Sequence, residues 1–275
     1  MGRYWNLTSR SPDPSFPLSG GIHPSSVVGP RVDFGPGCDV GPFCHFEGRV
    51  RAGERNRFGA GVAIGGAPMD TKYEGEDTEV RIGSGNTFFE YTTVHRASGK
   101  GNATVIGDDN FVMAYVHIAH NCSVGNGCVI TNLVQLGGHV EVGDLANIGG
   151  LVGIHQFCRI GTLAMVGAHT YVNKDIPPYM LAAGHPCRVR GLNSVGLRRA
   201  GISQSVQSLL RRAYRAIYRG GLNLAQALST IESDVLPQSA AGGGGRNELE
   251  ELIRFIRSSE RGVELRCGRE EQEWS

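Results

Sequence analysis

The segment IGDDNFVMAYVHIAHNCSVGNGCVI, residues 106–130, carries the pattern that decides the fold. An apolar residue recurs at every sixth position from Ile106 to Val172 without a miss, and the same count runs from Ile22 to Ile64 with Ala52 in one place. A second, mostly small residue stands four positions after each apolar one, as Cys122 follows Ile118. A six-residue period with two inward positions describes one short strand and one corner.

Three such strands make a triangular coil, and stacked coils pair their backbones at the strand spacing of about 4.8 Å. The repeat therefore predicts a mainly β protein, a left-handed parallel β-helix over residues 21–178 with roughly eight to nine coils. Glycine commonly follows the apolar residue, as at Gly41, Gly107 and Gly143. We expect these glycines at tight corners that exclude bulk and can need a positive φ.

Two segments interrupt the repeat while keeping its count, because Asp70, Glu76 and Lys100 stand where an apolar residue is expected. The sequence predicts excursions at GGAPMDTKYEGEDTEVR (65–81) and HRASGKGNATV (95–105). Five of the seven cysteines fall at the small inward position of the hexad. We interpret these five as core residues, and a cytoplasmic setting leaves little room for disulfides. They are Cys38, Cys44, Cys122, Cys128 and Cys158.

Beyond residue 178 the apolar spacing becomes helical, which predicts a small C-terminal α-helical domain over residues 179–263. One helix carries Val206, Leu209, Leu210, Ala213 and Ile217, and a second carries Leu224, Leu228, Ile231 and Val235. A third carries Leu249, Leu252, Ile253 and Ile256, with Asn247 as its predicted cap. The flanking segments are predicted to be a flexible arm (1–20) and a charged tail (264–275).

The charge pattern argues against a nucleic-acid or membrane partner and for an acidic one. The net charge of +1 argues against a nucleic-acid or membrane footprint for the whole protein. No apolar stretch is long enough for a membrane span, and residues 1–20 lack a signal-peptide pattern, so we expect a cytoplasmic protein. No Asp or Glu occurs between Ile176 and Ile231, yet eight arginines do, which predicts an acidic partner. They are Arg188, Arg190, Arg198, Arg199, Arg211, Arg212, Arg215 and Arg219.

The repeat gathers five histidines. The hexads that start at residues 118, 136 and 154 share one face and carry His120, His139 and His155. His117 is predicted at the corner that leads onto this face, and His95 opens the second excursion. Such a cluster fits either general base chemistry or a metal site. In a metal site each histidine ligand is oriented by a hydrogen-bond acceptor such as a carboxylate, and carboxylates are scarce on this face.

Several motifs together resemble a known family. They are HIAHNC (117–122), GGHV (137–140), HQFC (155–158), DIPPY (175–179), GLNSVGLRRAG (191–201) and AYRAIYR (213–219). In this order they resemble the UDP-N-acetylglucosamine O-acyltransferases that begin lipid A synthesis in Gram-negative bacteria. The resemblance covers about residues 21–263. It implies a homotrimer with active sites between subunits, which transfers a 3-hydroxyacyl chain from acyl carrier protein to the glucosamine 3-hydroxyl of UDP-N-acetylglucosamine.

The resemblance also implies roles for individual residues. His120 matches the family's general base, and Gly138 matches the residue whose backbone N–H faces the oxyanion. Other matched positions line the nucleotide-sugar and acyl pocket: Asp70, Lys72, His95, His117, His139, His155, Gln156, Asn193 and Arg199. An imidazole that titrates near 6.5 can take the proton of a sugar hydroxyl, and a fixed N–H can stabilise the oxyanion. Neither a cofactor nor a metal is expected.

Some positions depart from the family's pattern. Asn121 stands beside the base where Asp is common, so it offers no carboxylate to an imidazolium. Pro186 and Val195 replace polar residues near the nucleotide, and Ala200 interrupts an arginine pair. Ala168 and His169 match the positions that, by the resemblance, limit acyl length. The small Ala168 predicts a 3-hydroxyacyl chain of about twelve to fourteen carbons.

Three other functions stay open at this point. A related acyltransferase would act on a 3-amino sugar nucleotide or as the lipid A N-acyltransferase, although residues 1–20 leave no room for the latter's extra N-terminal domain. A γ-type carbonic anhydrase would bind zinc through histidines of neighbouring subunits, which elemental analysis would reveal. A scaffold without catalytic activity would need no clustered histidines.

Overall fold

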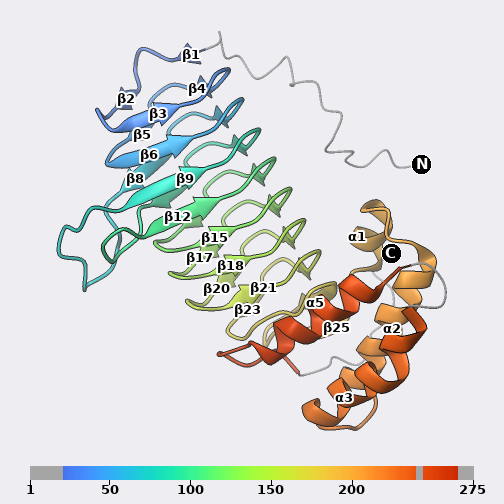
Figure 1. Ribbon diagram of the computed structural model, residues 1–275. Coiled ribbons are helices and arrows are strands. Elements are labelled where there is room, and N and C mark those ends of the chain that lie inside the picture. The colour runs from blue at the N-terminus through green and yellow to red at the C-terminus, as the bar shows by residue number, and fades with distance from the viewer. Residues whose placement is uncertain (1–20, 240–243, 266–275) are drawn as a thin grey trace. The chain divides into compact units, whose positions relative to one another are not determined.

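The computed structural model describes residues 21–239 and 244–265, and the chain divides into two compact units between His139 and Val140. The first unit, described from residue 21, consists of short parallel strands in three sheets, one for each side of the coil (Figure 1). The first sheet contains β1 (Gly21–Ile22), β4 (Asp39–Val40), β7 (Arg57–Phe58), β10 (Thr87–Phe88), β13 (Phe111–Val112) and β16 (Val129–Ile130). The second contains β2 (Val27–Val28), β5 (His45–Phe46), β8 (Ala63–Gly66), β11 (Thr93–His95), β14 (His117–Ile118) and β17 (Gln135–Leu136). The third contains β3 (Val32–Phe34), β6 (Arg49–Ala52), β9 (Glu79–Ile82), β12 (Ala103–Ile106) and β15 (Ser123–Val124).

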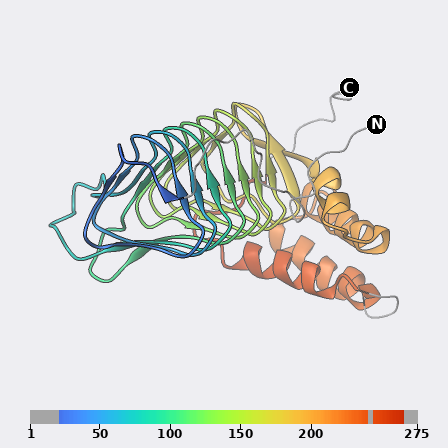
Figure 2. The same cartoon turned by 90° about the horizontal axis from the view of Figure 1, so that it is seen from above.

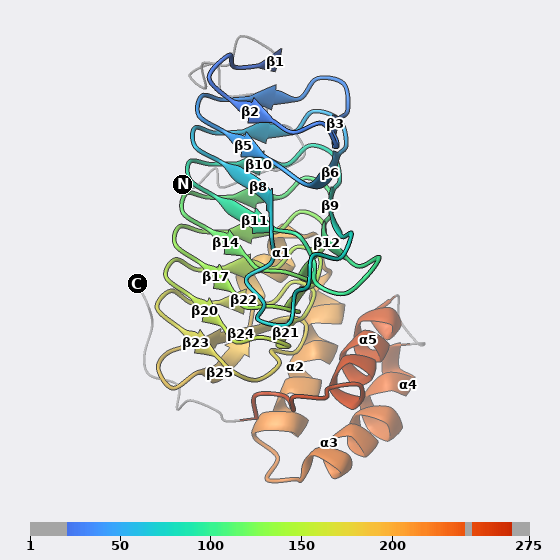
Figure 3. The ribbon, with the colours of Figure 1, turned by 90° about the vertical axis from the view of Figure 1, so that its left-hand side faces the viewer.

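The predicted inward positions form the core of this unit. Residues of successive coils stack in register, so that Val94 opposes Ile118 and Ile118 opposes Leu136, each at most 1% exposed. Figure 3 shows the strands of the second sheet one above another. The fold class expected from the hexads, a left-handed parallel β-helix followed by a helical part, is confirmed.

The two excursions leave the rows of inward residues in step, although the pairing of β11 with β8 shifts by one residue between Val94 and His95. Val40 opposes Phe58, eighteen residues later, whereas Phe58 opposes Phe88 and Phe88 opposes Val112. The longer steps, of thirty and twenty-four residues, hold the loops between β8 and β9 and between β11 and β12. Both loops, coloured teal, project from the coils (Figure 2). Because each adds a multiple of six residues, the inward pattern resumes unshifted.

The corner glycines act differently from the prediction. None of Gly41, Gly107 and Gly143 has a positive φ. They are required because the next coil approaches closely: a Cβ at Gly41 would lie 2.9 Å from the Phe58 carbonyl oxygen. After these three glycines the positive φ falls two residues later, on Phe43, Asp109 and Leu145. The expected positive φ at the glycines was therefore wrong, and close backbone approach is the reason for their small size.

The cysteines behave as core residues. Cys44, Cys122, Cys128 and Cys158 are buried, and Cys38 is half-buried. Their thiols face backbone carbonyls, as Cys122 Sγ donates to Gly137 O at 3.1 Å.

The second unit contains further strands and the helical part. Its strand pairs are β18 (Glu141–Val142) with β21 (Arg159–Ile160), β20 (Gly153–Ile154) with β23 (Tyr171–Val172), and β19 (Asn147–Ile148) with β22 (Met165–Val166), which β24 (Met180–Ala183) and the antiparallel β25 (Arg188–Leu192) extend. The helices are α1 (Ser194–Arg199), α2 (Gln204–Tyr218), α3 (Leu224–Thr230), the π-helix η2 (Ile231–Val235), α4 (Leu236–Ser239) and α5 (Arg246–Arg257). Helices thus begin at Ser194, after two strands beyond residue 178, and the division predicted there stays a proposal.

The helical faces agree with the predicted spacing in most positions. Val206, Leu210, Ala213 and Ile217 are buried on α2, while Leu209 is half-buried. The predicted cap Asn247 is wrong, because α5 begins at Arg246 and Gly245, with φ of 96°, occupies the cap. The predicted arm (1–20) and residues 266–275 of the predicted tail lie outside the described residues.

One buried ion pair joins the coil to α5 within this unit. Asp175, 1% exposed, accepts hydrogen bonds from the backbone N and the Nε of Arg159, at 2.8 and 3.0 Å. Arg159 in turn donates to the Phe255 carbonyl at 2.8 Å and lies over the Phe255 ring. The guanidinium therefore anchors the end of α5 to the strands.

Candidate active site

Two of the predicted histidines lie on adjacent strands of the second sheet. His117 lies inside strand β14 rather than at a corner, because the preceding corner residue is Tyr115. Its Nδ1 is 2.8 Å from the hydroxyl of Thr93, which opposes it in β11. His95 ends β11, and its ring meets the His117 ring edge to face at 5.2 Å. The parallel register therefore brings these two imidazoles together.

Burial keeps these imidazoles uncharged. Desolvation, with smaller contributions from His95 and His120, lowers the pKa of His117 to about 4. Desolvation also lowers the pKa values of His95 and His139. At neutral pH these rings are suited to hydrogen bonding with a ligand rather than to ion pairing.

His120 and Gly138 come from adjacent coils and meet closely. A Cβ at position 138 would lie 2.6 Å from His120 Nε2, so only glycine leaves room for this ring. The His139 ring packs edge to face against the His120 ring at 5.3 Å. Gly138 is buried, and its N–H donates no hydrogen bond to any of the residues that the structure describes. An imidazole nitrogen and an available backbone donor thus lie side by side.

Asp70 and Lys72 lie on the first excursion. Asp70 Oδ1 accepts a hydrogen bond from the Lys72 backbone N at 3.0 Å, and Oδ2 accepts one from the Ser98 hydroxyl at 2.8 Å. These two bonds lower the pKa of Asp70, and the charge of His120 adds to the effect. Asp70 is therefore a carboxylate at neutral pH. The Lys72 side chain is exposed beside it.

This arrangement fits acyl transfer to a hydroxyl. A base must present a nitrogen without a proton, and a developing oxyanion needs a fixed donor that is not already used. His120 and Gly138 meet both requirements, and the neutral histidines and Asp70 surround them with hydrogen-bonding groups.

Comparison with known proteins agrees with this chemistry. Residues 175–264 match the family model described as UDP N-acetylglucosamine O-acyltransferase, domain 2, and residues 103–138 match the bacterial transferase hexapeptide model of six repeats. The acyl-[acyl-carrier-protein]–UDP-N-acetylglucosamine O-acyltransferase of Burkholderia orbicola is 42% identical over 212 residues, which cover 77% of this chain and 79% of that protein. The protein of the same name from Gloeothece citriformis is 44% identical over 187 residues, 68% of each chain.

The chain belongs to the UDP-N-acetylglucosamine O-acyltransferase family.

Solved structures agree with this assignment. LpxA from Bacteroides fragilis, a UDP-N-acetylglucosamine acyltransferase, matches with a TM-score of 0.78 and 33% identity over 88% of this chain and 99% of that one. The UDP-N-acetylglucosamine acyltransferase of Arabidopsis matches with a TM-score of 0.76 and 31% identity, over 88% and 99%. The resemblance seen in the motifs is thereby confirmed, and the protein is an acyltransferase.

The remaining predicted residues of this acyltransferase lie in the second unit. His155 Nδ1 is 3.0 Å from the Gln156 carbonyl oxygen, and the Gln156 side chain is exposed. Asn193 caps α1, with its Oδ1 accepting from Gly196 N at 3.0 Å and its Nδ2 donating to Leu163 O at 2.9 Å. The Asn193 amide therefore already has a structural role.

Three more predicted residues of the second unit lie at its surface. Arg199 is exposed at the end of α1. Ala168 and His169 are also exposed, and His169 takes a positive φ of 57° at a corner.

The sequence analysis did not identify two hydroxyls of the candidate site. Thr93 faces His117, and Ser98 bonds to Asp70 and to Asn121. The hexad count identifies Thr93 as a neighbour, because it precedes an inward residue just as His117 does. Ser98 lies in an excursion, where the repeat gives no information about neighbours.

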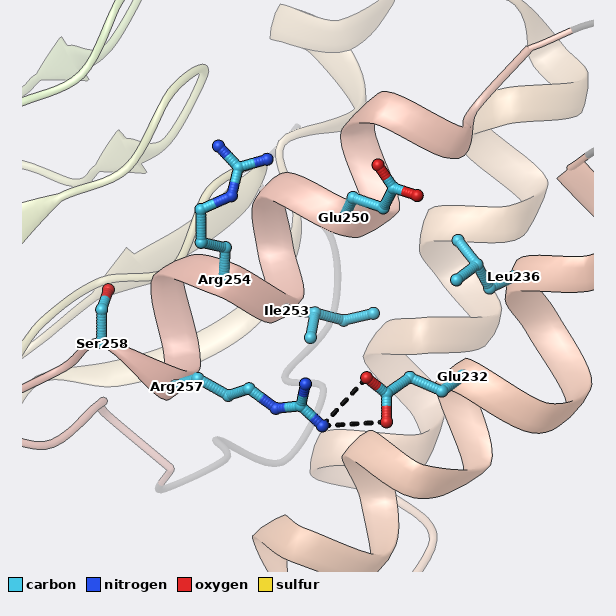
Figure 4. A pocket seen from close by; sticks show the side chains of 7 residues that line it. All are labelled: Glu232, Leu236, Glu250, Ile253, Arg254, Arg257 and Ser258. Carbon is cyan, nitrogen blue, oxygen red and sulfur yellow. Dashed lines mark hydrogen bonds and ion pairs between the residues drawn. The ribbon is translucent and has the colours of Figure 1, made fainter.

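The helical part of the acyltransferase has a separate pocket (Figure 4). It is lined by Glu232, Leu236, Glu250, Ile253, Arg254, Arg257 and Ser258. Arg257 closes one side through an ion pair with Glu232 at 2.9 Å. None of the predicted site residues lines this pocket.

Over residues 21–239 and 244–265, no helix is long and apolar enough to cross a membrane. In the same residues, no group of three His, Cys, Asp or Glu side chains is arranged to hold a metal ion.

Proposed function

We propose that this acyltransferase transfers a 3-hydroxyacyl chain from acyl carrier protein to the glucosamine 3-hydroxyl of UDP-N-acetylglucosamine, the first step of lipid A biosynthesis. Its relatives carry this donor and acceptor in their names. The observation that carries the proposal is the close approach of the His120 ring to Gly138, whose backbone N–H donates no hydrogen bond within the described residues. The reaction is expected in the cytoplasm, where acyl carrier protein supplies the thioester.

In the proposed mechanism, His120 Nε2 takes the proton of the 3-hydroxyl as its oxygen attacks the thioester carbonyl. The Gly138 N–H then stabilises the oxyanion of the tetrahedral intermediate. When the intermediate collapses, the carbon–sulfur bond breaks, and the imidazolium returns the proton to the leaving thiolate. The neutral His117, His95 and His139, with Asp70 and Lys72, hold the sugar nucleotide and the acyl chain.

The second unit contributes further binding residues in this proposal. His155, Gln156, Asn193 and Arg199 bind the nucleotide sugar and the acyl group, and Ala168 with His169 limits the acyl length. The eight arginines of residues 188–219 support a dock for acyl carrier protein, because six of them are exposed and the segment holds no acid.

A homotrimer is also part of the proposal. Large apolar residues are exposed along one edge of the first unit: Phe43 (75%), Tyr91 (53%), Tyr115 (52%) and Leu133 (44%). All four occupy positive-φ corners after strands of the first sheet, and the Tyr91 and Tyr115 rings stack at 5.1 Å. A row of apolar side chains on successive coils favours burial against a second copy. Light scattering should give three times the chain mass of 29.4 kDa.

Turnover with a defined product tests the proposed function. Mass spectrometry should detect a 3-hydroxyacyl ester of UDP-N-acetylglucosamine when purified protein is given a ladder of 3-hydroxyacyl carrier proteins. Parallel assays with the 3-amino analogue would reveal amide formation instead. His120→Ala should lower kcat by at least about 10²-fold, the usual contribution of a general base. His23→Ala, at an exposed position of the first coil, is the control.

A result in which His120→Ala keeps more than a tenth of the wild-type kcat would remove His120 from the role of base. A lack of product with every carrier protein would overturn the proposed reaction itself.

A further inference from the structure

Ser98 and Asn121 form a pair of hydrogen bonds that fixes how the Asn121 amide is oriented. The Ser98 backbone N–H donates to Asn121 Oδ1 at 2.8 Å, and Asn121 Nδ2 donates to the Ser98 carbonyl oxygen at 3.0 Å. The two ends of an amide are normally hard to tell apart, and their assignment depends on the hydrogen-bond network. Here both partners belong to the backbone, where N–H can only donate and C=O can only accept. The oxygen of Asn121 must therefore face the Ser98 N–H.

This orientation determines the tautomer of His120. Asn121 Oδ1 also lies 2.9 Å from His120 Nδ1. Because this oxygen can only accept, Nδ1 of a neutral imidazole must carry the proton, and Nε2 must then be the free nitrogen. Nε2 lies, with Cε1, on the edge of the ring that faces Gly138.

The hydroxyl of Ser98 links the Asn121 amide to the Asp70 carboxylate. Ser98 Oγ lies 2.8 Å from Asp70 Oδ2 and 3.2 Å from Asn121 Oδ1. A hydroxyl has one hydrogen, and the shorter bond to the carboxylate is the stronger one. This bond holds the charged Asp70 carboxylate near His120, with the Asn121 amide between them. Asn121 itself supplies no charge.

We propose that Ser98 is a positioning residue of this enzyme, whose backbone holds Asn121 so that His120 keeps its Nδ1–H tautomer, and whose hydroxyl holds Asp70 as the counter-charge of the imidazolium. This inference rests on the proposed role of His120 as the base. It gives His120 a counter-charge although Asn stands in place of Asp at position 121.

Other bonds keep Ser98 in place for this task. The Ser98 carbonyl also accepts from Asn102 Nδ2 at 2.9 Å, and the next residue, Gly99, donates its N–H to Glu76 Oε1 at 2.9 Å. The Asn121 backbone N–H donates to the buried Thr104 hydroxyl at 2.9 Å. Both partners of the pair are therefore held from two sides.

The tautomer can be measured without substrate, which separates this inference from the proposed reaction. Long-range ¹H–¹⁵N spectra of protein labelled at histidine should show Nδ1–H for His120, assigned by its loss in His120→Gln. In Asn121→Leu, which removes the acceptor, His120 should lose this fixed tautomer. An Nε2–H tautomer in the wild type would overturn the inference, whether or not the protein turns over.

The hydroxyl is tested by Ser98→Ala, with Ser98→Thr as the conservative variant and Ser123→Ala, an exposed serine of β15, as the control. Ser98→Ala keeps the backbone pair, so His120 should remain Nδ1–H. The midpoint of the His120 NMR titration and the acidic limb of the kcat/KM profile should both move to lower pH, because the Asp70 carboxylate is no longer held near the imidazolium. Thr should restore both. If Ser98→Ala leaves both midpoints at their wild-type values, the hydroxyl does not link Asp70 to the base.

A purely structural role for Ser98 predicts a different result. Loop destabilisation would lower the amount of active enzyme without moving either midpoint, and this outcome also counts against the inference.

Discussion

Gly138 lies so close to His120 that a Cβ at position 138 would stand 2.6 Å from both Nε2 and Cε1 of the imidazole. The absence of a side chain at position 138 therefore leaves room for the imidazole of the proposed base.

Gly138→Ala should displace the His120 ring and lower kcat by roughly 10²-fold, since a misplacement of about 1 Å has an effect of that size. The φ of Gly138 is not positive, so the backbone should accept alanine and the thermal midpoint should change little. Gly153→Ala is a matched control, because its Cβ would make an ordinary contact with Tyr171 at 3.6 Å. Steady-state kinetics and thermal unfolding of both variants check this. An active Gly138→Ala enzyme would contradict the proposed geometry.

The low pKa of His117 predicts how stability depends on pH. His117 titrates near 6.5 in the unfolded chain and at about 4 in the folded protein. Between these values the unfolded chain binds the proton more readily, so the free energy of unfolding falls as the pH is lowered from 7 towards 4. The loss is roughly 2 kcal/mol, since each pKa unit corresponds to about 1.4 kcal/mol and the ring is only partly buried.

Urea unfolding at pH 7 and pH 5 measures this dependence. His117→Gln should show a smaller loss on acidification than the wild type, whereas His23→Gln, at an exposed site, should behave like the wild type. If the free energy of unfolding falls by the same amount between pH 7 and pH 5 in all three proteins, His117 does not govern the pH dependence of stability.

The exposed arginines should set the affinity for acyl carrier protein. Arg199→Ala combined with Arg215→Ala should raise the KM for the carrier protein several-fold with little change in kcat, and the wild-type KM should rise with salt as screening shortens the electrostatic field. Arg246→Ala serves as the control, because this exposed arginine is already paired with Glu250 at 2.7 Å. A KM that ignores both salt and the double substitution would leave these arginines outside the dock.

Acyl length is expected to depend on Ala168. Ala168→Met adds bulk at an exposed position and should shift the preference towards acyl chains shorter than the expected twelve to fourteen carbons, since each lost methylene contact is worth about 0.8 kcal/mol. Competition among 3-hydroxyacyl carrier proteins of different length, read by mass spectrometry, measures the preference. An unchanged order of preference would place the length-limiting residue elsewhere.

The hexad count alone determined the main architecture, because an inward residue at every sixth position has only one way to reach a common core. It therefore predicted the buried rows that contain Ile118 and Leu136, the core position of Cys122, and that the excursions keep the count of six. Helical spacing likewise predicted the buried faces of α2 and α5. These predictions succeed because each depends on a local period.

Only the tertiary structure decided which polar groups meet. Asp70, Ser98 and Asn121 are far apart in the chain, and two of them lie in loops whose path the repeat does not encode. The prediction of a positive φ at the corner glycines failed for a related reason: the constraint on Gly41 comes from the backbone of the next coil, not from its own torsion angles. The tautomer of His120 depends on such contacts as well, because a hydrogen-bond partner 23 residues away, Ser98, turns the Asn121 amide.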